Sequence, residues 1–406
     1  MNILQYYTRG IRTLWGGLTL ACLSMMLLCT SPAQAETMAG MGGETQSKKE
    51  GNVPANIETI IDAFLNAIPA GQPVPSATDI QTLMDYSLSV SAPQKTIPEP
   101  RPQGKGAFVR QTLQLPLTQV LQYCFNPAIP GEAVYPSTIN FSYWLPQSQI
   151  VTQKIKLWEK LDLPDDSKPI VLRGQEFEEI TPDTFSNCYY DYTLNRLLIL
   201  STIKGRNVLI SVSRQAGPSS VGKVGAILGK DDEWHYLYSK EVGSNLSLAR
   251  WAETYMYDSA NLTIFFEPTP HSPTTEMAFF KYVRAGWSKM NMVKSKHIYE
   301  GSQRYLNGLR QILESPTRPS AENIAAKYRE FKNMHSEQLR AQLVPFSTAL
   351  APWGEGKSDI SSKDFKKLLG SGQYVPTLST RQMSSELLKQ FLKHTLQKPL
   401  FAPSQP

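Results

Sequence analysis

The sequence predicts an α+β protein in which a curved antiparallel sheet is closed by a long helix, with added helices at both ends. Two observations carry this prediction. Between residues 107 and 267, short β-rich runs alternate with turn residues, which is typical of antiparallel strands. Apolar residues at helical spacing then follow in residues 275–314. The chain has 406 residues, enough for two or three domains.

The N-terminus has the three parts of a secretory signal peptide. Arg9 and Arg12 are positive, residues 14–28 are apolar or small, and the stretch ending at Ala35 has the small-x-small pattern of a cleavage site. We therefore expect residues 1–35 to be a signal peptide cleaved after Ala35. The mature protein is then expected in the periplasm.

Two other interpretations of the N-terminus stay open. An uncleaved anchor would need ~20 apolar residues to span a bilayer, and this stretch is shorter. A lipoprotein would be modified at Cys29, but Leu28 stands where a small residue is needed. No later apolar stretch is long enough to span a membrane, so we expect the mature chain not to be transmembrane.

Residues 36–106 are predicted to precede the main domain. Residues 36–55 are polar and glycine-containing, which favours a disordered leader. Apolar residues at helical spacing in 57–68 and 80–88 predict a helical hairpin, with Ser76 and Asp79 as possible caps. Residues 94–106 form a proline-rich linker.

Residues 107–315 are predicted to be the main α+β domain. A period-2 strand begins at Ala107, and Pro116 then starts a short helix to Phe125. The further predicted strands are 138–145, the hairpin 197–203 and 208–212, the run 234–238, and a second hairpin, 250–257 and 262–267, turning at 258–261. The segment 146–190 is proline-rich and weakly periodic, so its strand order is left undefined.

Two helical patterns follow the strands. The first starts at Thr275, and its apolar stripe consists of Phe280, Val283, Trp287 and Met290. The second covers residues 298–314, and the sequence leaves open whether the two patterns form one helix or two. Residues 316–406 are predicted to be a helical extension with a helix over 320–343, a loop around Trp353-Gly354 and a last helix over 383–396.

Two cysteines remain after signal cleavage, Cys124 and Cys188. An oxidising compartment favours a disulfide between them. Two buried, unpaired thiols are the other possibility, and sequence spacing does not decide between the two.

Most motifs that suggest chemistry lack the context that the chemistry needs. Gly217–Val224 imitates a phosphate-binding loop, but Val224 replaces the required Ser or Thr. The five histidines have no metal-ligand spacing, and the acidic residues Glu176, Glu178 and Glu179 are expected to be solvated. We therefore predict no cofactor and no metal site, and an enzymatic function is not favoured. The mild net charge of +6 gives nucleic-acid binding little support.

The order of strand, short helix, antiparallel hairpins and long closing helix in residues 107–315 resembles the helix-grip fold of START-type lipid-transfer domains. The resemblance implies an apolar cavity between the sheet and the last helix, which binds a lipid or another hydrophobic small molecule. Its predicted lining comprises Phe280, Val283, Trp287, Met290, Tyr190 and Tyr255.

The alternative function is a non-catalytic structural or assembly factor of the cell envelope. Its terminal helices would then bind a protein partner, and residues 383–396 would present an exposed apolar patch.

Overall fold

The computed structural model describes residues 51–90, 96–163, 168–243, 252–354 and 363–400. The predicted signal peptide and most of the predicted leader lie outside these ranges. Gly51–Pro406 form one compact unit. Its centre is a nine-stranded sheet with the strand order β1-β2-β3-β12-β11-β8-β7-β5-β4, antiparallel except for the β1–β2 pair.

The strands of this sheet are β1 (Gly51–Asn52), β2 (Thr96–Ile97), β3 (Lys105–Leu113), β4 (Ile139–Trp144), β5 (Ile170–Ile180), β7 (Asp191–Ile203), β8 (Arg206–Gln215), β11 (Thr254–Phe266) and β12 (Thr275–Trp287). A second sheet contains β6 (Cys188–Tyr189), β9 (Lys223–Ile227) and β10 (Tyr236–Val242). The helices are α3 (Ala55–Asn66), α4 (Ala77–Ser89), α5 (Leu117–Cys124), α6 (Gln149–Thr152), α7 (Ser295–Leu313), α8 (Ala321–Lys332), α9 (Ser336–Gln342), α10 (Val344–Gly354), α11 (Lys363–Gly370), α12 (Tyr374–Thr377) and α13 (Thr380–Thr395), with short 3-10 turns η1 (Gly131–Ala133), η2 (Leu157–Glu159) and η3 (Asp231–Glu233).

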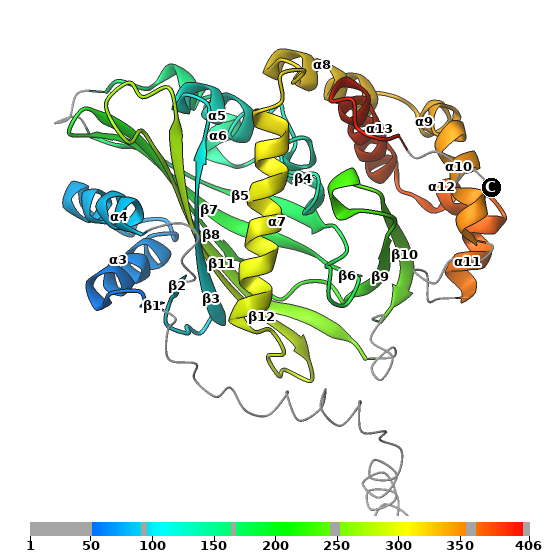
Figure 1. The fold of residues 1–406 in the computed structure, drawn as a ribbon, viewed down its shortest axis with the longest axis horizontal. Coiled ribbons are helices and arrows are strands. Elements are labelled where there is room, and N and C mark those ends of the chain that lie inside the picture. The colour runs from blue at the N-terminus through cyan, green and yellow to red at the C-terminus, as the bar shows by residue number, and fades with distance from the viewer. Residues whose placement is uncertain (1–50, 91–95, 164–167, 244–251, 355–362, 401–406) are drawn as a thin grey trace, which may run out of the picture. The chain divides into compact units, whose positions relative to one another are not determined.

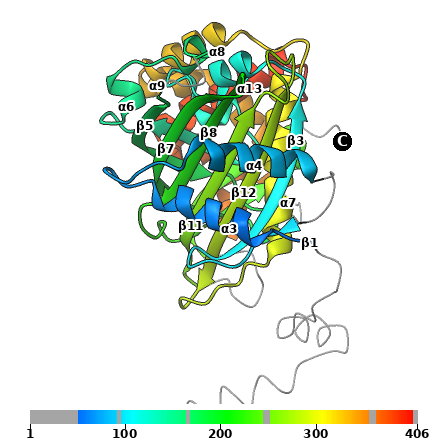
Figure 2. The same ribbon diagram turned by 90° about the vertical axis from the view of Figure 1, so that its left-hand side faces the viewer.

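Helices α3 and α4 cover one face of the large sheet (Figure 2). The predicted caps of α4 are confirmed, because Ser76 and Asp79 form a capping box. The apolar side of the hairpin packs on alternate residues of the central strands, among them Ile210, Leu262 and Phe280. This burial explains why two short helices are stable here, since isolated helices of this length are marginal in water.

The long helix α7 lies across the opposite face, over β3 and β12 (Figure 1). Its buried residues Leu306, Leu309 and Ile312 belong to the same core cluster as Val109 and Phe279 of those strands. The antiparallel α+β architecture predicted from the sequence is therefore confirmed. Residues 295–313 form a single helix, and further helices follow it along the chain.

The C-terminal helices pack on the rest of the protein. Helix α13 contacts β4, α8 and α9, and its residues Met383, Leu387, Leu388 and Leu392 are buried. The expectation of an exposed apolar patch on residues 383–396 is thus wrong. Lys389 is also buried and donates to Asn140 Oδ1 at 2.9 Å, which ties the helix to β4.

Two secondary-structure predictions near the end of the sheet are wrong. The segment from Thr275 that was predicted to be a helix is strand β12. Its apolar residues alternate between two covered faces, and a strand of this kind can imitate helical spacing. The hairpin predicted in 250–267 is one strand, β11, which pairs along its length with β12. The residues predicted to form the turn fit within the strand because neighbouring strands supply partners for their polar side chains. Asp258, for example, forms an ion pair with Arg214 of β8 at 2.9 Å.

Other predictions differ less. Strand β3, helix α5, strand β4 and the β7–β8 hairpin are confirmed, and the hairpin turns at Lys204 and Gly205, with φ of 51° and 73°. The helix predicted over 320–343 is two helices, α8 and α9, and Trp353-Gly354 end helix α10 instead of forming a loop. In the described part of the chain, every helix is too short or too polar to cross a lipid bilayer.

Candidate binding site beneath helix α7

The predicted ligand-binding residues do not share one surface. Phe280 faces α3 and α4, with its ring centroid 4.5 Å from that of Phe108. Val283 and Tyr190 lie together on the α7 side of the sheet. Met290 is 52% exposed after the end of β12. The prediction that these side chains form one helical stripe is therefore wrong, because β12 alternates its side chains between the two faces.

Trp287 and Tyr255 lie near the same end of the sheet. Trp287 is the last residue of β12 and shares the strand parity of Val283. Tyr255, in β11, is half-buried, and its hydroxyl donates to Glu253 Oε2 at 2.9 Å. Its ring is stacked with that of Tyr257, with 6.1 Å between the ring centroids. Tyr255 has the opposite parity to Met256, which packs beside Tyr190, so it points away from the α7 side.

A row of polar residues crosses the middle of the sheet on the α7 side. Arg196, Ser213, Asn261 and Lys281 are direct cross-strand neighbours on β7, β8, β11 and β12. We call these four residues the polar row. Neighbours in one register line up on one face of a sheet, so the row is continuous. Asn261 Nδ2 donates to Ser213 Oγ at 3.1 Å, and within the described part of the chain its buried Oδ1 accepts no hydrogen bond.

Arg196 is held by two carboxylates of β5. Its Nε lies 2.6 Å from Glu176 Oε2, and its Nη2 lies 3.0 Å from Glu178 Oε1. Burial by itself lowers the pKa of Arg196, but Glu176 and Glu178 raise it above its ordinary value. Burial raises the pKa of Glu176. The expectation that Glu176, Glu178 and Glu179 are solvated is wrong: they are 8%, 8% and 6% exposed.

Lys281 is the second cation of the polar row. Burial lowers the pKa of Lys281 to about 8. Its Nζ donates to Ser259 Oγ at 2.8 Å, and no carboxylate among the described residues forms an ion pair with it. The carboxylate of Glu178 offsets part of this lowering of the pKa, but a poorly solvated ammonium held by one neutral hydroxyl remains costly, since buried charges are ordinarily paired. Lys281 is therefore suited to receive an acidic group.

The polar row lies between two apolar regions. On one side is the main core with Leu198, Phe279 and helix α7. On the other side is a small cluster that contains Tyr190, Leu194 and Met256, with Val283 partly buried against it. The Tyr190 hydroxyl donates to Thr254 Oγ1 at 3.0 Å. The arrangement places a polar band next to a modest apolar surface, which is the pattern of many small-molecule sites.

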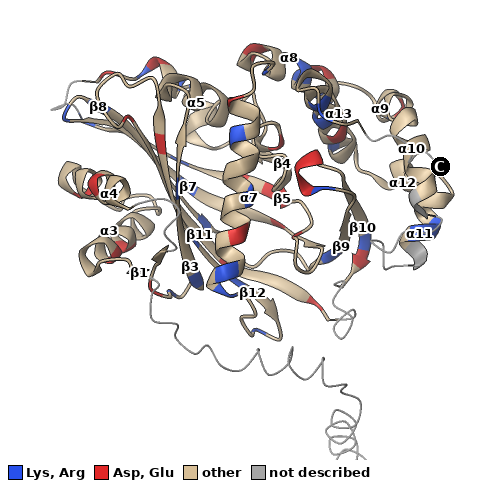
Figure 3. Ribbon diagram, viewed as in Figure 1, with Lys and Arg blue, Asp and Glu red and all other residues tan. Residues whose placement is uncertain are grey.

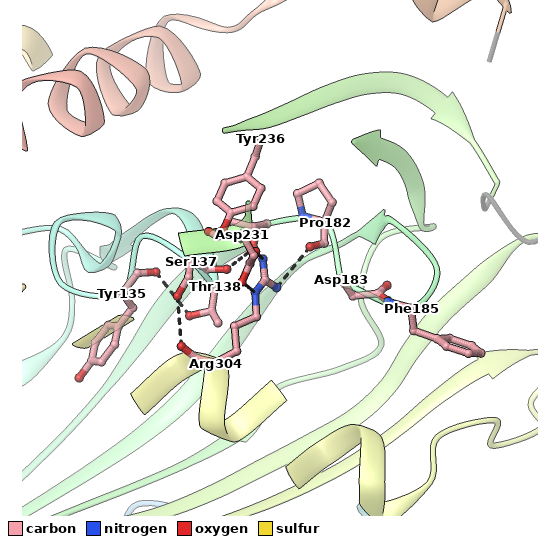
Figure 4. A network of polar contacts seen from close by, with 10 residues as sticks. Tyr135, Ser137, Thr138, Pro182, Asp183, Phe185, Asp231, Tyr236 and Arg304 are labelled. Atoms are coloured by element: carbon pink, nitrogen blue, oxygen red, sulfur yellow. Dashed lines mark hydrogen bonds and ion pairs between the residues drawn. The ribbon is translucent and has the colours of Figure 1, made fainter. Parts of the chain in front are cut away.

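Arg304 fixes α7 relative to the second sheet (Figure 4). Its Nε and Nη2 each donate to a different carboxylate oxygen of Asp231, both at 2.7 Å, and its Nη1 donates to Pro182 O at 3.3 Å. The Tyr236 hydroxyl donates to Asp231, and the guanidinium carbon lies 5.5 Å from the centroid of the Tyr236 ring. Such bidentate pairs are geometrically specific, so the covering helix is held in one position above the polar row.

The two cysteines are unpaired, so the predicted disulfide is not formed. The thiol of Cys188 donates to Gly243 O at 3.3 Å, and Cys124 packs against the main core. Burial raises the pKa of both thiols, to about 12 for Cys124. These are properties of inert buried cysteines.

Other sequence candidates do not form a site. The segment Gly217–Val224 connects β8 with β9 and uses its amides within the protein, as Ser219 N donates to Met256 O at 2.9 Å and Gly222 N to Thr254 O at 2.8 Å. Within the described ranges, no three His, Cys, Asp or Glu residues are grouped to hold a metal ion. A shallow recess lined by residues such as Leu237 and Leu350 does not include the polar row.

Sequence reasoning did not single out Arg196, Asn261 or Lys281. The available signal was a charged or amide residue inside an otherwise apolar strand, as with Arg196 in Leu194–Leu200. A residue of that kind on a strand covered on both faces must be buried.

Comparison with protein-family models finds no match, and no curated protein matches the sequence.

Proposed function

We propose that this protein binds an amphipathic small molecule, with an apolar chain and an acidic head group, between the large sheet and helix α7. The head group is received by Lys281 of the polar row. The apolar chain lies along Val283 and Tyr190, toward the end of β12. The observation that carries the proposal is the half-buried Lys281, whose ammonium has one neutral acceptor and forms no ion pair among the described residues.

The solvent-accessible surface of Arg196 and Lys281, on a covered face of the sheet, supports this proposal. The Arg196 side chain is 19% exposed although β7 is a central strand and both of its faces are covered. Lys281 also keeps accessible surface, while burial lowers its pKa to about 8. A ligand that reaches this accessible surface would meet both cations of the polar row.

The position of the polar row supports the choice of an amphipathic ligand over a purely apolar one. An apolar molecule alone would leave the ammonium of Lys281 without compensation. A carboxylate or phosphate would convert the lysine into a charge-assisted pair. The resemblance to helix-grip lipid-binding domains fits this location, since it implies a ligand between the sheet and the long helix.

The test compares two ligands that differ only in the head group. Delipidated protein is titrated with dodecanoate and with dodecanol, and binding is measured by calorimetry. We expect the wild-type protein to bind dodecanoate at least about tenfold more tightly, because a buried charge-assisted pair contributes roughly 1.5–3 kcal/mol. Lys281→Met should abolish this preference. Lys332→Met, on the exposed side of α8, is the matched control and should keep it.

Equal affinity of the wild-type protein for the two ligands, or a preference unchanged in Lys281→Met, would contradict the acidic head group. The absence of saturable binding for both ligands would contradict the proposed function itself. Mass spectrometry of a lipid extract from the purified mature protein is the complementary measurement, with an acidic amphiphile as the expected species.

A further inference from the structure

The end of the sheet next to Val283 carries an unusual group of exposed apolar side chains. Met290 is 52% exposed, Met292 is 40% exposed and Phe185 is 59% exposed. They belong to the segment after β12 and to the loop between β5 and β6. Large apolar side chains are exposed at few other described positions, so their grouping at one end needs an explanation.

The two methionines are held on a defined turn. Met290 N donates to Trp287 O at 2.9 Å. The two residues between Trp287 and Met290 are Ser288 and Lys289, with φ of 46° and 63°. Two left-handed residues make a tight turn that is costly for residues other than glycine. Lys289 N donates to the Tyr257 hydroxyl at 2.8 Å, and Met292 N donates to Ala285 O at 2.9 Å. The turn is therefore rigidly mounted on the sheet.

Phe185 is held beside the start of α7. Asp183 Oδ1 accepts a hydrogen bond from the Phe185 amide at 2.8 Å. The Phe185 ring stacks on His297, with 4.8 Å between the ring centroids. Figure 4 shows Phe185 pointing away from the Arg304 network. His297 is in the first turn of α7, only a few residues after Met292, so Phe185 and the methionines belong to the same end of the protein.

Basic side chains surround this apolar group. Arg284, Lys289 and Lys296 are exposed, and Figure 3 shows basic residues at the first turn of α7 and along β12. The acidic residues there are Asp183, whose Oδ1 accepts hydrogen bonds from the Phe185 and Ser186 amides, Glu253, which accepts one from the Tyr255 hydroxyl, and Glu300, whose Oε1 is 3.8 Å from Lys296 Nζ. These carboxylates have partners within the protein, whereas no carboxylate of the described residues forms an ion pair with the exposed Arg284 or Lys289. Exposed apolar side chains with a basic rim fit a surface that is apolar inside and negative outside.

We propose that this end of the protein, defined as Phe185, Arg284, Lys289, Met290, Met292 and Lys296 and called the membrane-contact end, docks on an anionic lipid bilayer. Met290, Met292 and Phe185 insert among the acyl chains near the head groups. The basic side chains contact lipid phosphates. A basic residue near an anionic bilayer contributes about fivefold to the binding constant. Docking here places the bilayer next to the apolar surface of Val283.

The test is vesicle binding, which does not depend on a bound ligand. Delipidated protein is sedimented with phosphatidylcholine vesicles and with vesicles that also contain phosphatidylglycerol. We expect binding to the anionic vesicles, at least tenfold weaker binding to the neutral ones, and a marked loss in high salt. The double variant Met290→Asp/Met292→Asp should lose at least tenfold. Val344→Asp is the matched control, since Val344 is 57% exposed on α10, and should bind as the wild type does.

Thermal unfolding verifies that each variant is folded. The double variant Lys289→Glu/Lys296→Glu, which changes no apolar residue, should also lose binding to the anionic vesicles. Equal binding to both vesicle types, or equal losses in the methionine variant and Val344→Asp, would overturn the proposal. Sedimentation velocity without lipid adds another decisive outcome. A dimer that the methionine variant converts to a monomer, with no vesicle binding, would assign this end to self-association.

Discussion

Replacing Lys281 by methionine should stabilise the delipidated protein while it weakens ligand binding. The pKa of Lys281 is lowered from 10.5 to about 8, so keeping the ammonium charged at neutral pH costs about 3 kcal/mol of folding free energy. Methionine has a similar length and no charge. Loss of the hydrogen bond to Ser259 offsets about 1 kcal/mol, so the net gain should be about 2 kcal/mol.

The pH dependence gives this prediction a clear sign. A lysine with a lowered pKa in the folded state destabilises the fold fully below about pH 8, and the penalty disappears as the pH rises toward 10.5. The advantage of Lys281→Met should thus shrink between these pH values. Urea unfolding of the delipidated wild type, Lys281→Met and the control Lys332→Met at neutral and alkaline pH measures it. A variant that is less stable than the wild type at neutral pH would refute the reasoning.

Three further substitutions or assays test particular parts of the structure. Phe280→Ala should lower the free energy of unfolding by about 3–5 kcal/mol, because the ring is buried under α3 and α4. It should leave the dodecanoate affinity of the folded protein unchanged, and a specific loss of affinity would place the ring in the binding site. Burial raises the pKa of Glu132 to about 7, so wild-type stability should fall as the pH rises from about 5 to above 7, and Glu132→Gln should flatten that fall in thermal midpoint. An unchanged slope would show that another group titrates. Thiol titration of the denatured, unreduced mature protein should detect both Cys124 and Cys188; a count of none would restore the disulfide.

The parts of the fold that were predicted correctly are those marked by a clear local signal in the sequence. The α3–α4 hairpin shows clear helical spacing, because its outer side is exposed and polar. The β7–β8 hairpin is marked by the Lys204-Gly205 turn. Strand β12 was mistaken for a helix because both of its faces are covered and its sequence has no simple alternation.

The candidate site was harder to predict than the fold. Val283 and Tyr190 were named as lining residues, and the structure brings them together. Arg196 and Lys281 are far apart in sequence and become neighbours only through the pairing register of β7, β8, β11 and β12. Sequence periodicity gives no register between distant strands, so it could not reveal that these polar residues form a row.

The affinity for dodecanoate as a function of pH tests the central claim most directly. Dodecanoate stays ionised above neutral pH, whereas Lys281 loses its proton near pH 8. Calorimetric titration of the delipidated protein should give an affinity that falls by about tenfold between about pH 7 and pH 9, and the weaker binding by Lys281→Met should not change over this range. A wild-type affinity that is constant across this range, or that falls equally in Lys281→Met, would contradict an acidic head group bound at Lys281.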